Sequence, residues 1–249
     1  EVMIERNISK TLKELFIRFD LEGDPDLYLN ELESDRHFLD SIETMVAPVP
    51  EFITKHFTSI FQLGGAYKTI QYVLVRILKP EILVETGVLH GLSSAFILSA
   101  IKKNKAGRLI SIDKPAYKQW RDRPLSDLGK VDSDSLPENK ESGWAIPEYL
   151  RCNWELRLGV SLEELPVLFE DMRCNYFVHD SEHTYENMMF ELNTAWQNIA
   201  FDGIIVCDNV DWSSAFSDFC KQNKIDSVSV SEEGNIDQGT TRFGIIRKA

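Results

Sequence analysis

The chain has 249 residues, of which 43% are hydrophobic and 27% charged, as in an ordinary folded protein. Its formal net charge of −13 and the lack of a basic run argue against a nucleic-acid partner. No apolar run approaches the ~20 residues that span a bilayer, and the first residues lack the apolar stretch of a signal peptide, so no membrane partner is expected. The four scattered cysteines, with Cys174 and Cys207 in or beside apolar runs, indicate reduced core thiols and a cytoplasmic location.

Residues 1–78 are predicted to form an N-terminal helical cap. Apolar residues recur at helical spacing within 8–19 and again within 66–79. Between them, the stretch from Asp20 to Glu43 holds nine acidic residues and one arginine, which is typical of a solvated helical face.

From residue 79 onward, short apolar runs alternate with helical patterns. Strands are expected at 81–87, 107–113, 153–159, 174–180 and 203–208, and helices at 92–103, 161–172, 184–199 and 212–223. Two further strands around a Gly/Asn turn within 226–248 predict an antiparallel hairpin at the sheet edge. Such alternation predicts an α/β domain over 79–249, with a mostly parallel sheet covered by helices on both faces.

Residues 114–147 interrupt this alternation. They contain four prolines, many charges and few apolar periods, and they are too long for an ordinary connection between a strand and a helix. Because the segment follows the carboxyl end of a strand, we interpret it as an insertion that forms a lid or substrate loop. A plain surface excursion is the alternative.

A glycine-containing loop follows the first strand of the predicted sheet. Glu85, Gly87 and Gly91 form the pattern E-x-G-x-x-x-G, and glycines at such a place let the backbone approach a ligand closely. The dinucleotide pattern G-x-G-x-x-G is missing, which disfavours an NAD-dependent oxidoreductase. About twenty residues later the next strand ends in Asp113, an acid that can accept both ribose hydroxyls of a nucleoside.

On these residues the chain resembles the class I S-adenosylmethionine-dependent methyltransferases, over roughly residues 81–248. The resemblance implies a Rossmann-like sheet of seven strands and S-adenosylmethionine as the cofactor. It implies Ser161 near the adenine, although Val160 stands where the family often carries an acid. The expected cofactor-binding residues are Glu85, Gly87, Gly91, Ser93, Asp113, Ser161 and Asp180.

The segment 180–185 reads D-x-x-H-x-Y, which is similar to a branch of small-molecule O-methyltransferases that includes macrolide-sugar enzymes. Asp180 and Asp208 close two predicted strands, whose carboxyl ends meet at one edge of the sheet. With Asn209 they offer three oxygen donors of the kind that Mg²⁺ prefers, and the set resembles that of catechol-type and macrolide-type metal-dependent enzymes. An Asp-Asn pair that simply initiates a turn is the alternative.

His183 follows Asp180 by three residues, where the resembled families carry a lysine or histidine base. A neutral imidazole there could take the proton of an attacking hydroxyl. Alternatively, Asp180 and His183 orient the following helix, with Thr184 as its N-cap. His179 precedes Asp180 and is expected to point to the opposite side of the strand.

These patterns predict methyl transfer from S-adenosylmethionine to a hydroxyl of a small molecule, assisted by Mg²⁺ or another divalent cation. Two alternatives stay open: a metal-independent methyltransferase acting on N, O or C, and a hydroxylase-like or non-catalytic member of the same fold. The second arises because some relatives of the D-x-x-H-x-Y branch are hydroxylases. The sequence identifies neither the acceptor nor the oligomeric state, and a homo-oligomer is among the options.

Overall fold

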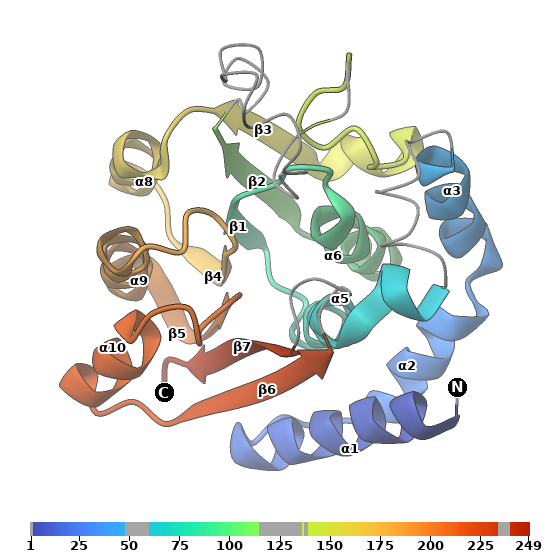
Figure 1. The fold of residues 1–249 in the computed structure, drawn as a ribbon, viewed down its shortest axis with the longest axis horizontal. Coiled ribbons are helices and arrows are strands. Elements are labelled where there is room, and N and C mark those ends of the chain that lie inside the picture. Colours follow the sequence, from blue (N-terminus) through green and yellow to red (C-terminus); the bar gives the residue numbers. More distant parts are fainter. Residues whose placement is uncertain (1, 48–59, 115–135, 137–138, 234–239) are drawn as a thin grey trace, which may run out of the picture.

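The computed structural model describes residues 2–47, 60–114, 136, 139–233 and 240–249, which form a seven-stranded mixed sheet with helices around it (Figure 1). The strand order is β3-β2-β1-β4-β5-β7-β6. The strands are β1 (Ile82–Thr86), β2 (Arg108–Asp113), β3 (Trp154–Leu158), β4 (Cys174–His179), β5 (Ile199–Cys207), β6 (Ser227–Glu233) and β7 (Thr240–Arg247). The first five pair in parallel, and β7 is antiparallel to both β5 and β6. The predicted fold class and its antiparallel edge pair are therefore confirmed, and the expected Gly/Asn turn between β6 and β7 lies outside the described residues.

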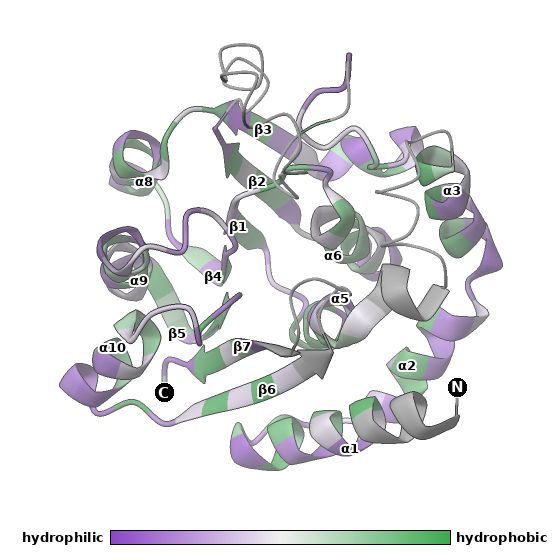
Figure 2. Cartoon of the chain, in the orientation of Figure 1, coloured by the Kyte–Doolittle hydropathy of each residue, from purple (hydrophilic) through white to green (hydrophobic). Residues whose placement is uncertain are grey.

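Helices cover both faces of the sheet (Figure 1). One face carries α5 (Ile60–Leu78) and α6 (Leu92–Asn104), with α1 (Val2–Arg18), α2 (Pro25–Ser34) and α3 (Arg36–Val46) outside them. The other face carries α8 (Ser161–Glu170), α9 (Tyr185–Asn198) and α10 (Ala215–Asn223), and the 3₁₀-helix η2 (Glu148–Asn153) leads into β3. Apolar residues gather where helices meet strands, whereas the outer helix faces are more hydrophilic (Figure 2).

Alternation along β1 decides which side chains reach which helix layer. Leu83 packs in the cluster beneath α5 and α6, and Val84 packs in the cluster beneath α8, α9 and α10. Because side chains alternate along a strand, the next two residues follow the same rule. Glu85 therefore faces α6, and Thr86 faces α9.

The N-terminal helices share a hydrophobic core with the sheet, since Leu12, Leu15 and Phe38 belong to the same cluster as Leu83. The acidic stretch is not simply a solvated face. Within it, the carboxylate of Glu31 accepts hydrogen bonds from Tyr72 Oη and Arg76 Nε on α5, both at 2.6 Å. The division of the chain at residue 78 stays a prediction.

The expected insertion at 114–147 falls largely on residues 115–135 and 137–138, which lie outside the described residues. Its last part docks on the loop after β1. The Gly143 amide donates to the Leu89 carbonyl at 2.8 Å, and the Ala145 amide donates to the His90 carbonyl at 2.9 Å. Trp144 Nε1 donates to His90 Nδ1 at 2.9 Å, so His90 packs and hydrogen-bonds here.

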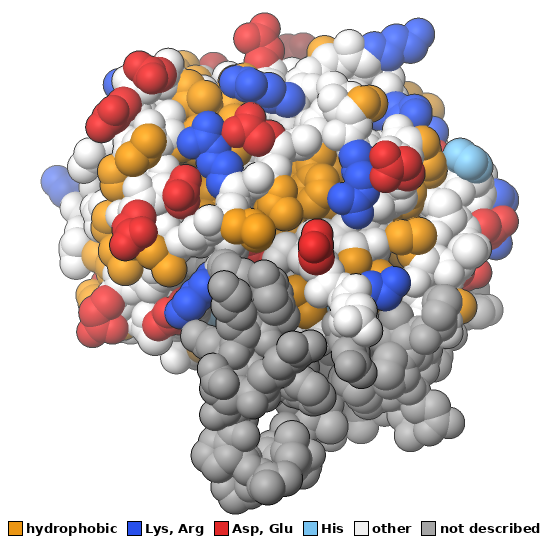
Figure 3. Space-filling view, turned by 90° about the horizontal axis from the view of Figure 1, so that it is seen from above, with side chains coloured by type: hydrophobic (Ala, Val, Ile, Leu, Met, Phe, Trp, Pro, Cys, Tyr) orange, Lys and Arg blue, Asp and Glu red, His pale blue; other side chains and the backbone are white. Residues whose placement is uncertain are grey.

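None of the helices in the described part of the chain combines the length and apolarity required to cross a membrane. The thiols of Cys174 and Cys207 are free and buried, as predicted. On the face seen in Figure 3, the lysine and arginine side chains of the described residues are interspersed with acidic and apolar ones.

Candidate functional site

Two backbone hydrogen bonds extend the sheet by one residue beyond the ends of β4 and β5. The Asp180 amide donates to the Thr86 carbonyl at 2.9 Å, and the Asp208 amide donates to the His179 carbonyl at 2.8 Å. Each aspartate therefore begins its loop in register with the neighbouring strand. This places Asp180 and Asp208 side by side at the carboxyl edge, as the sequence predicted.

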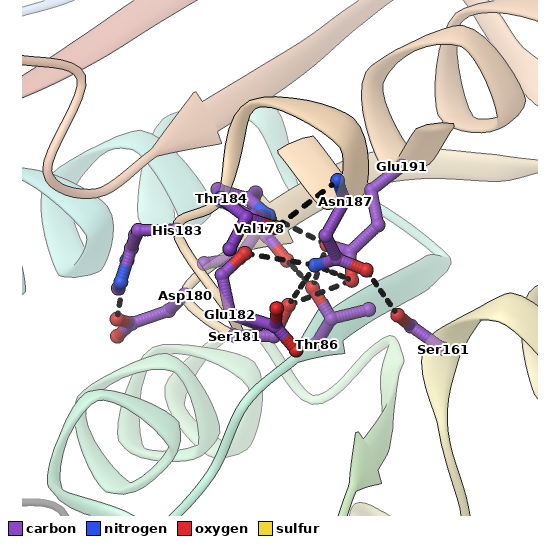
Figure 4. Close-up of polar contacts among 11 residues, drawn as sticks. Thr86, Ser161, Val178, Asp180, Ser181, Glu182, His183, Thr184, Asn187 and Glu191 are labelled. Atoms are coloured by element: carbon purple, nitrogen blue, oxygen red, sulfur yellow. Dashed lines mark hydrogen bonds and ion pairs between the residues drawn. The ribbon is translucent and has the colours of Figure 1, made fainter. Parts of the chain in front are cut away.

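Asp180, His183 and Asp208 form a group in which one ligand atom of each lies within 4.8 Å of the others. His183 Nε2 is 3.9 Å from Asp180 Oδ1 (Figure 4). Burial, followed by the charge and hydrogen bond of Asp208, raises the pKa of Asp180 well above its ordinary value. Two carboxylates in contact require a shared proton or a cation, so this donor set fits a divalent metal ion.

Asn209 was the third expected metal ligand. Its backbone has a left-handed φ of 48°, and its carbonyl accepts the Trp212 amide at 3.0 Å. Asn209 thus begins a turn, which was the alternative interpretation, and its side chain as a ligand stays a prediction. The group described above contains His183, which the sequence analysis assigned only as a base.

His183 lies between two other rings, with ring centroids 5.4 Å from His179 and 5.1 Å from Trp212. Burial, followed by the neighbouring His179, lowers the pKa of His183 to about 4. The imidazole is therefore neutral near pH 7 and can either bind a cation or accept a proton. Thr184 is the N-cap of α9, with its side chain accepting the Asn187 amide at 3.4 Å, as the alternative interpretation of this segment held.

Helix α5 contributes side chains to this site that no sequence pattern indicated. Tyr67 is 7% exposed, and burial, followed by the charges of Asp180 and Asp208, raises its pKa well above the ordinary value. Lys68 acts in the opposite sense on Asp180, since its charge lowers the pKa of that carboxyl. Residues of α5 therefore face the carboxylate pair, although no local pattern links them to it.

Gly87 and Gly91 both have a positive φ, of 82° and 80°. A Cβ on Gly87 would lie 1.9 Å from the Asp180 carbonyl oxygen, and a Cβ on Gly91 would lie 2.7 Å from the Cα of Gly143. The structure thus requires glycine at both positions because the chain approaches itself there. Their contact with a cofactor stays a prediction.

Asp113 ends β2 against the glycine loop. Its Oδ1 and Oδ2 accept the amides of Val88 and Leu89, each at 3.2 Å. Burial raises the pKa of Asp113, and a hydrogen bond from Ser142 acts against this rise. The acid is therefore beside the loop, where a ribose-binding carboxylate would be needed, and Ser142 is a neighbour that the sequence did not indicate.

Glu85 lies beneath this loop and is fully buried. Its Oε1 accepts hydrogen bonds from Ser94 at 2.6 Å and Ser111 at 2.5 Å, whereas Oε2 has no partner among the described residues. Burial raises the pKa of Glu85 to about 7. Ser93 precedes Ser94 in the first turn of α6, and cofactor contacts of Glu85 and Ser93 stay predictions.

Behind the aspartates lies a second polar network, drawn in Figure 4. Ser161, the first residue of α8, donates to Asn187 Oδ1 at 3.3 Å, and Asn187 donates in turn to Glu191 Oε1 at 3.1 Å. Glu191 also contacts His179, which faces α9 and thus points away from Asp180, as predicted. No pattern in the sequence indicated a role for Glu191.

Comparison with known proteins identifies the fold. Three solved structures superpose on most of the chain: an O-methyltransferase from Bacillus cereus in complex with SAH, the O-methyltransferase TomG from Streptomyces achromogenes in complex with SAM, and SAH-bound methyltransferase PaMTH1 from Podospora anserina. Their TM-scores are 0.56, 0.54 and 0.52 at 16%, 15% and 15% identity; they cover 90%, 84% and 86% of this chain and 96%, 89% and 88% of their own. At such identities the likeness shows the fold alone.

A search of curated proteins finds no match. A family model described as a methyltransferase domain matches residues 84–210, just over half of the chain. The match includes the glycine loop, Asp113, Asp180 and Asp208, which carry the site described above. The chain therefore belongs to this methyltransferase domain family, as the resemblance in its sequence implied.

Proposed function

We propose that this protein transfers the methyl group of S-adenosylmethionine to a hydroxyl of a small molecule, assisted by a divalent cation. The observation that carries the proposal is the contacting pair Asp180 and Asp208, with His183 beside it, at the carboxyl edge of a methyltransferase sheet. Structural neighbours that are O-methyltransferases determined with SAM or SAH support the cofactor and the type of acceptor.

The cofactor supplies a methyl group bound to a positively charged sulfur, which an acceptor oxygen can attack. Asp113 would accept the ribose hydroxyls, because its carboxylate already lies against the loop amides of Val88 and Leu89. Ser161, at the start of α8, would lie near the adenine. The full proposed set of cofactor contacts is Glu85, Gly87, Gly91, Ser93, Asp113, Ser161 and Asp180.

Asp180 and Asp208, with Asn209 or His183, would hold Mg²⁺ or Mn²⁺. A cation bound there would lower the pKa of the acceptor hydroxyl and orient its oxygen. His183, whose pKa of about 4 makes it a weak base, can accept a proton only from a hydroxyl that is already acidified. The proposed roles of the cation and of His183 are therefore linked.

A methyltransferase without a cation is the second candidate. It is favoured by the raised pKa of Asp180, because Asp180 and Asp208 can also be satisfied by sharing one proton. In that case the chain would act by orienting the acceptor alone.

Cofactor binding is tested by calorimetric titration with S-adenosylhomocysteine. Asp113→Asn keeps the size of the side chain but removes its charge, so the affinity should fall about 10–100-fold, as for a lost hydrogen bond to a charged group. The matched control is Asp171→Asn, an exposed acid after α8, which should bind like the wild type. Binding of NAD in place of S-adenosylhomocysteine would overturn the proposal.

The cation is tested with a panel of small-molecule hydroxyl acceptors, including vicinal diols, by measuring formation of S-adenosylhomocysteine. Turnover should disappear in excess EDTA and return when Mg²⁺ is added back. Turnover that persists in EDTA would favour the metal-free candidate. Methylation of amines but not of hydroxyls would contradict the proposed acceptor class.

A further inference from the structure

Glu191 is a fully buried carboxylate on α9 to which the proposed reaction gives no role. It accepts hydrogen bonds from several side chains, including Thr86 Oγ1 at 2.5 Å, His179 Nδ1 at 2.6 Å, Ser181 Oγ at 2.7 Å and Asn187 Nδ2 at 3.1 Å. Burial alone would raise its pKa, but His179 and the hydroxyls of Ser161 and Thr86 hold the pKa below its ordinary value. Glu191 is therefore ionised, and every donor points at a negative charge.

The donors surround Asp180 along the chain. His179 and Ser181 are the residues immediately before and after it, and Thr86 holds the Asp180 amide through its backbone carbonyl. Glu191 binds the side chains of both His179 and Ser181, on either side of Asp180, and so holds these two neighbours toward α9. Figure 4 shows this arrangement, with Asp180 pointing toward His183 and away from Glu191.

The same carboxylate also supports His183. Glu191 fixes the His179 ring through Nδ1, and that ring meets the His183 ring nearly at right angles, at 83°. Asn187, one helical turn before Glu191, donates to Ser181 Oγ at 3.0 Å and to the Glu182 carbonyl at 2.9 Å. Helix α9 thereby holds the whole segment that lies between Asp180 and His183.

We infer that Glu191 is the positioning residue of the proposed cation site. It sets the directions of Asp180 and His183 through their neighbours and touches neither cation, cofactor nor acceptor. This inference rests on the proposed function, because the cation site belongs to it. Outer partners that orient metal ligands typically contribute 10–100-fold to metal affinity, whereas a merely structural carboxylate would leave the affinity of the folded protein unchanged.

The test is a titration with Mn²⁺ alone, followed by electron paramagnetic resonance of the free ion. Glu191→Gln keeps the side-chain volume, but its NH₂ group would face donors that now bind a carboxylate oxygen. The variant should bind Mn²⁺ about 10–100-fold more weakly, with cooperative unfolding retained. Wild-type Mn²⁺ affinity in the folded variant would overturn the inference.

Glu31→Gln is the matched control. Glu31, like Glu191, is a carboxylate that accepts hydrogen bonds from side chains, here Tyr72 and Arg76, but it lies in the N-terminal helices. It should lower stability and leave Mn²⁺ affinity unchanged. Should Glu191→Gln fail to fold, Ser181→Ala removes one donor at a half-buried position and should weaken Mn²⁺ binding by a smaller factor. Unchanged affinity in that variant would equally count against the inference.

A second readout separates this inference from the proposed function. In metal-free protein labelled with ¹³C-histidine, the Cε1–H resonance of His183 should shift in Glu191→Gln and stay in place in Glu31→Gln. If the wild type binds no Mn²⁺, the proposed cation is wrong, and this resonance alone decides the positioning of His183. A His183 resonance that does not move in Glu191→Gln would overturn the inference that Glu191 positions His183.

Discussion

The carboxylates of Asp180 and Asp208 are hydrogen-bonded to each other at the ends of two neighbouring parallel strands. Without a cation they repel one another once their shared proton leaves. We predict that Asp208→Asn raises the free energy of unfolding in EDTA at pH 8 by about 1–2 kcal/mol, as is typical when a strained functional site is relieved. Mn²⁺ should raise the melting temperature of the wild type but not of the variant. Thermal unfolding with and without Mn²⁺ measures both effects, and a less stable variant in EDTA would contradict the prediction.

His183→Ala should lower kcat by about 10²–10⁴-fold, the usual contribution of a general base. The same variant decides between its two roles. Weaker Mn²⁺ binding identifies His183 as a ligand, and unchanged Mn²⁺ binding with reduced kcat identifies it as the base. A variant that keeps both kcat and Mn²⁺ affinity would leave His183 with neither role.

The pH dependence of the wild type follows from the lowered pKa of His183, about 4. The imidazole charges only as the pH falls through that value, so it is neutral at pH 6. We expect the His183 imidazole, followed by its own Cε1–H resonance in the metal-free protein, to titrate at about pH 4. A midpoint at the ordinary histidine value of about 6.5 would contradict the lowering by burial.

Glu85 should make stability fall as the pH rises. Its pKa is about 7 in the folded protein, against an ordinary value of 4.5, so the folded state holds the proton more tightly. Stability from this group is therefore fully present below pH 4.5 and is lost as the pH rises to 7, by about 3 kcal/mol. Urea unfolding gives the free energy of unfolding of the wild type and of Glu85→Gln. Between pH 4.5 and 8, the wild type should lose about 3 kcal/mol relative to the variant. If the free energies of unfolding of the two proteins change with pH in parallel, the prediction is wrong.

Gly87→Ala should disturb the site through the backbone. The added Cβ would meet the Asp180 carbonyl oxygen at 1.9 Å, so the end of β4 has to move. We expect a loss of about 3 kcal/mol or more in the free energy of unfolding, together with weaker Mn²⁺ binding. Gly23→Ala is the control, because Gly23 also has a positive φ but its Cβ would meet only the end of the Ile77 side chain. It should lose about 1 kcal/mol and bind Mn²⁺ normally.

Most of the fold could be predicted because its signals are local. Strands such as β4 and β5 are short apolar runs between helical patterns. The alternation of side chains along a strand correctly predicted that His179 and Asp180 point to opposite sides. The meeting of Asp180 and Asp208 followed from a general rule of parallel sheets, without knowledge of any contact.

The remaining features depend on contacts between distant segments. In the sequence, Glu191 looks like one more polar residue of an amphipathic helix. Its role becomes visible only in the structure, where Thr86 at the end of β1 and His179 at the end of β4 bind its carboxylate. Tyr67 faces Asp180 from a helix more than a hundred residues earlier. Gly87 was interpreted as leaving room for a ligand, whereas its nearest neighbour is the Asp180 carbonyl.

The central position of β1 has a consequence for how the chain folds during synthesis. β1 pairs with β2 on one side and with β4 on the other, and the Ile82 amide donates to Asn175 Oδ1 across 93 residues of sequence. Such long-range pairs form late, because closing the intervening loop costs entropy before any contact is gained. A nascent chain therefore carries β1 with one of its two neighbours missing until β4 has been made. The proposed cation site cannot form before residue 208 has left the ribosome, so a cation can stabilise the sheet only after β1, β4 and β5 have been made.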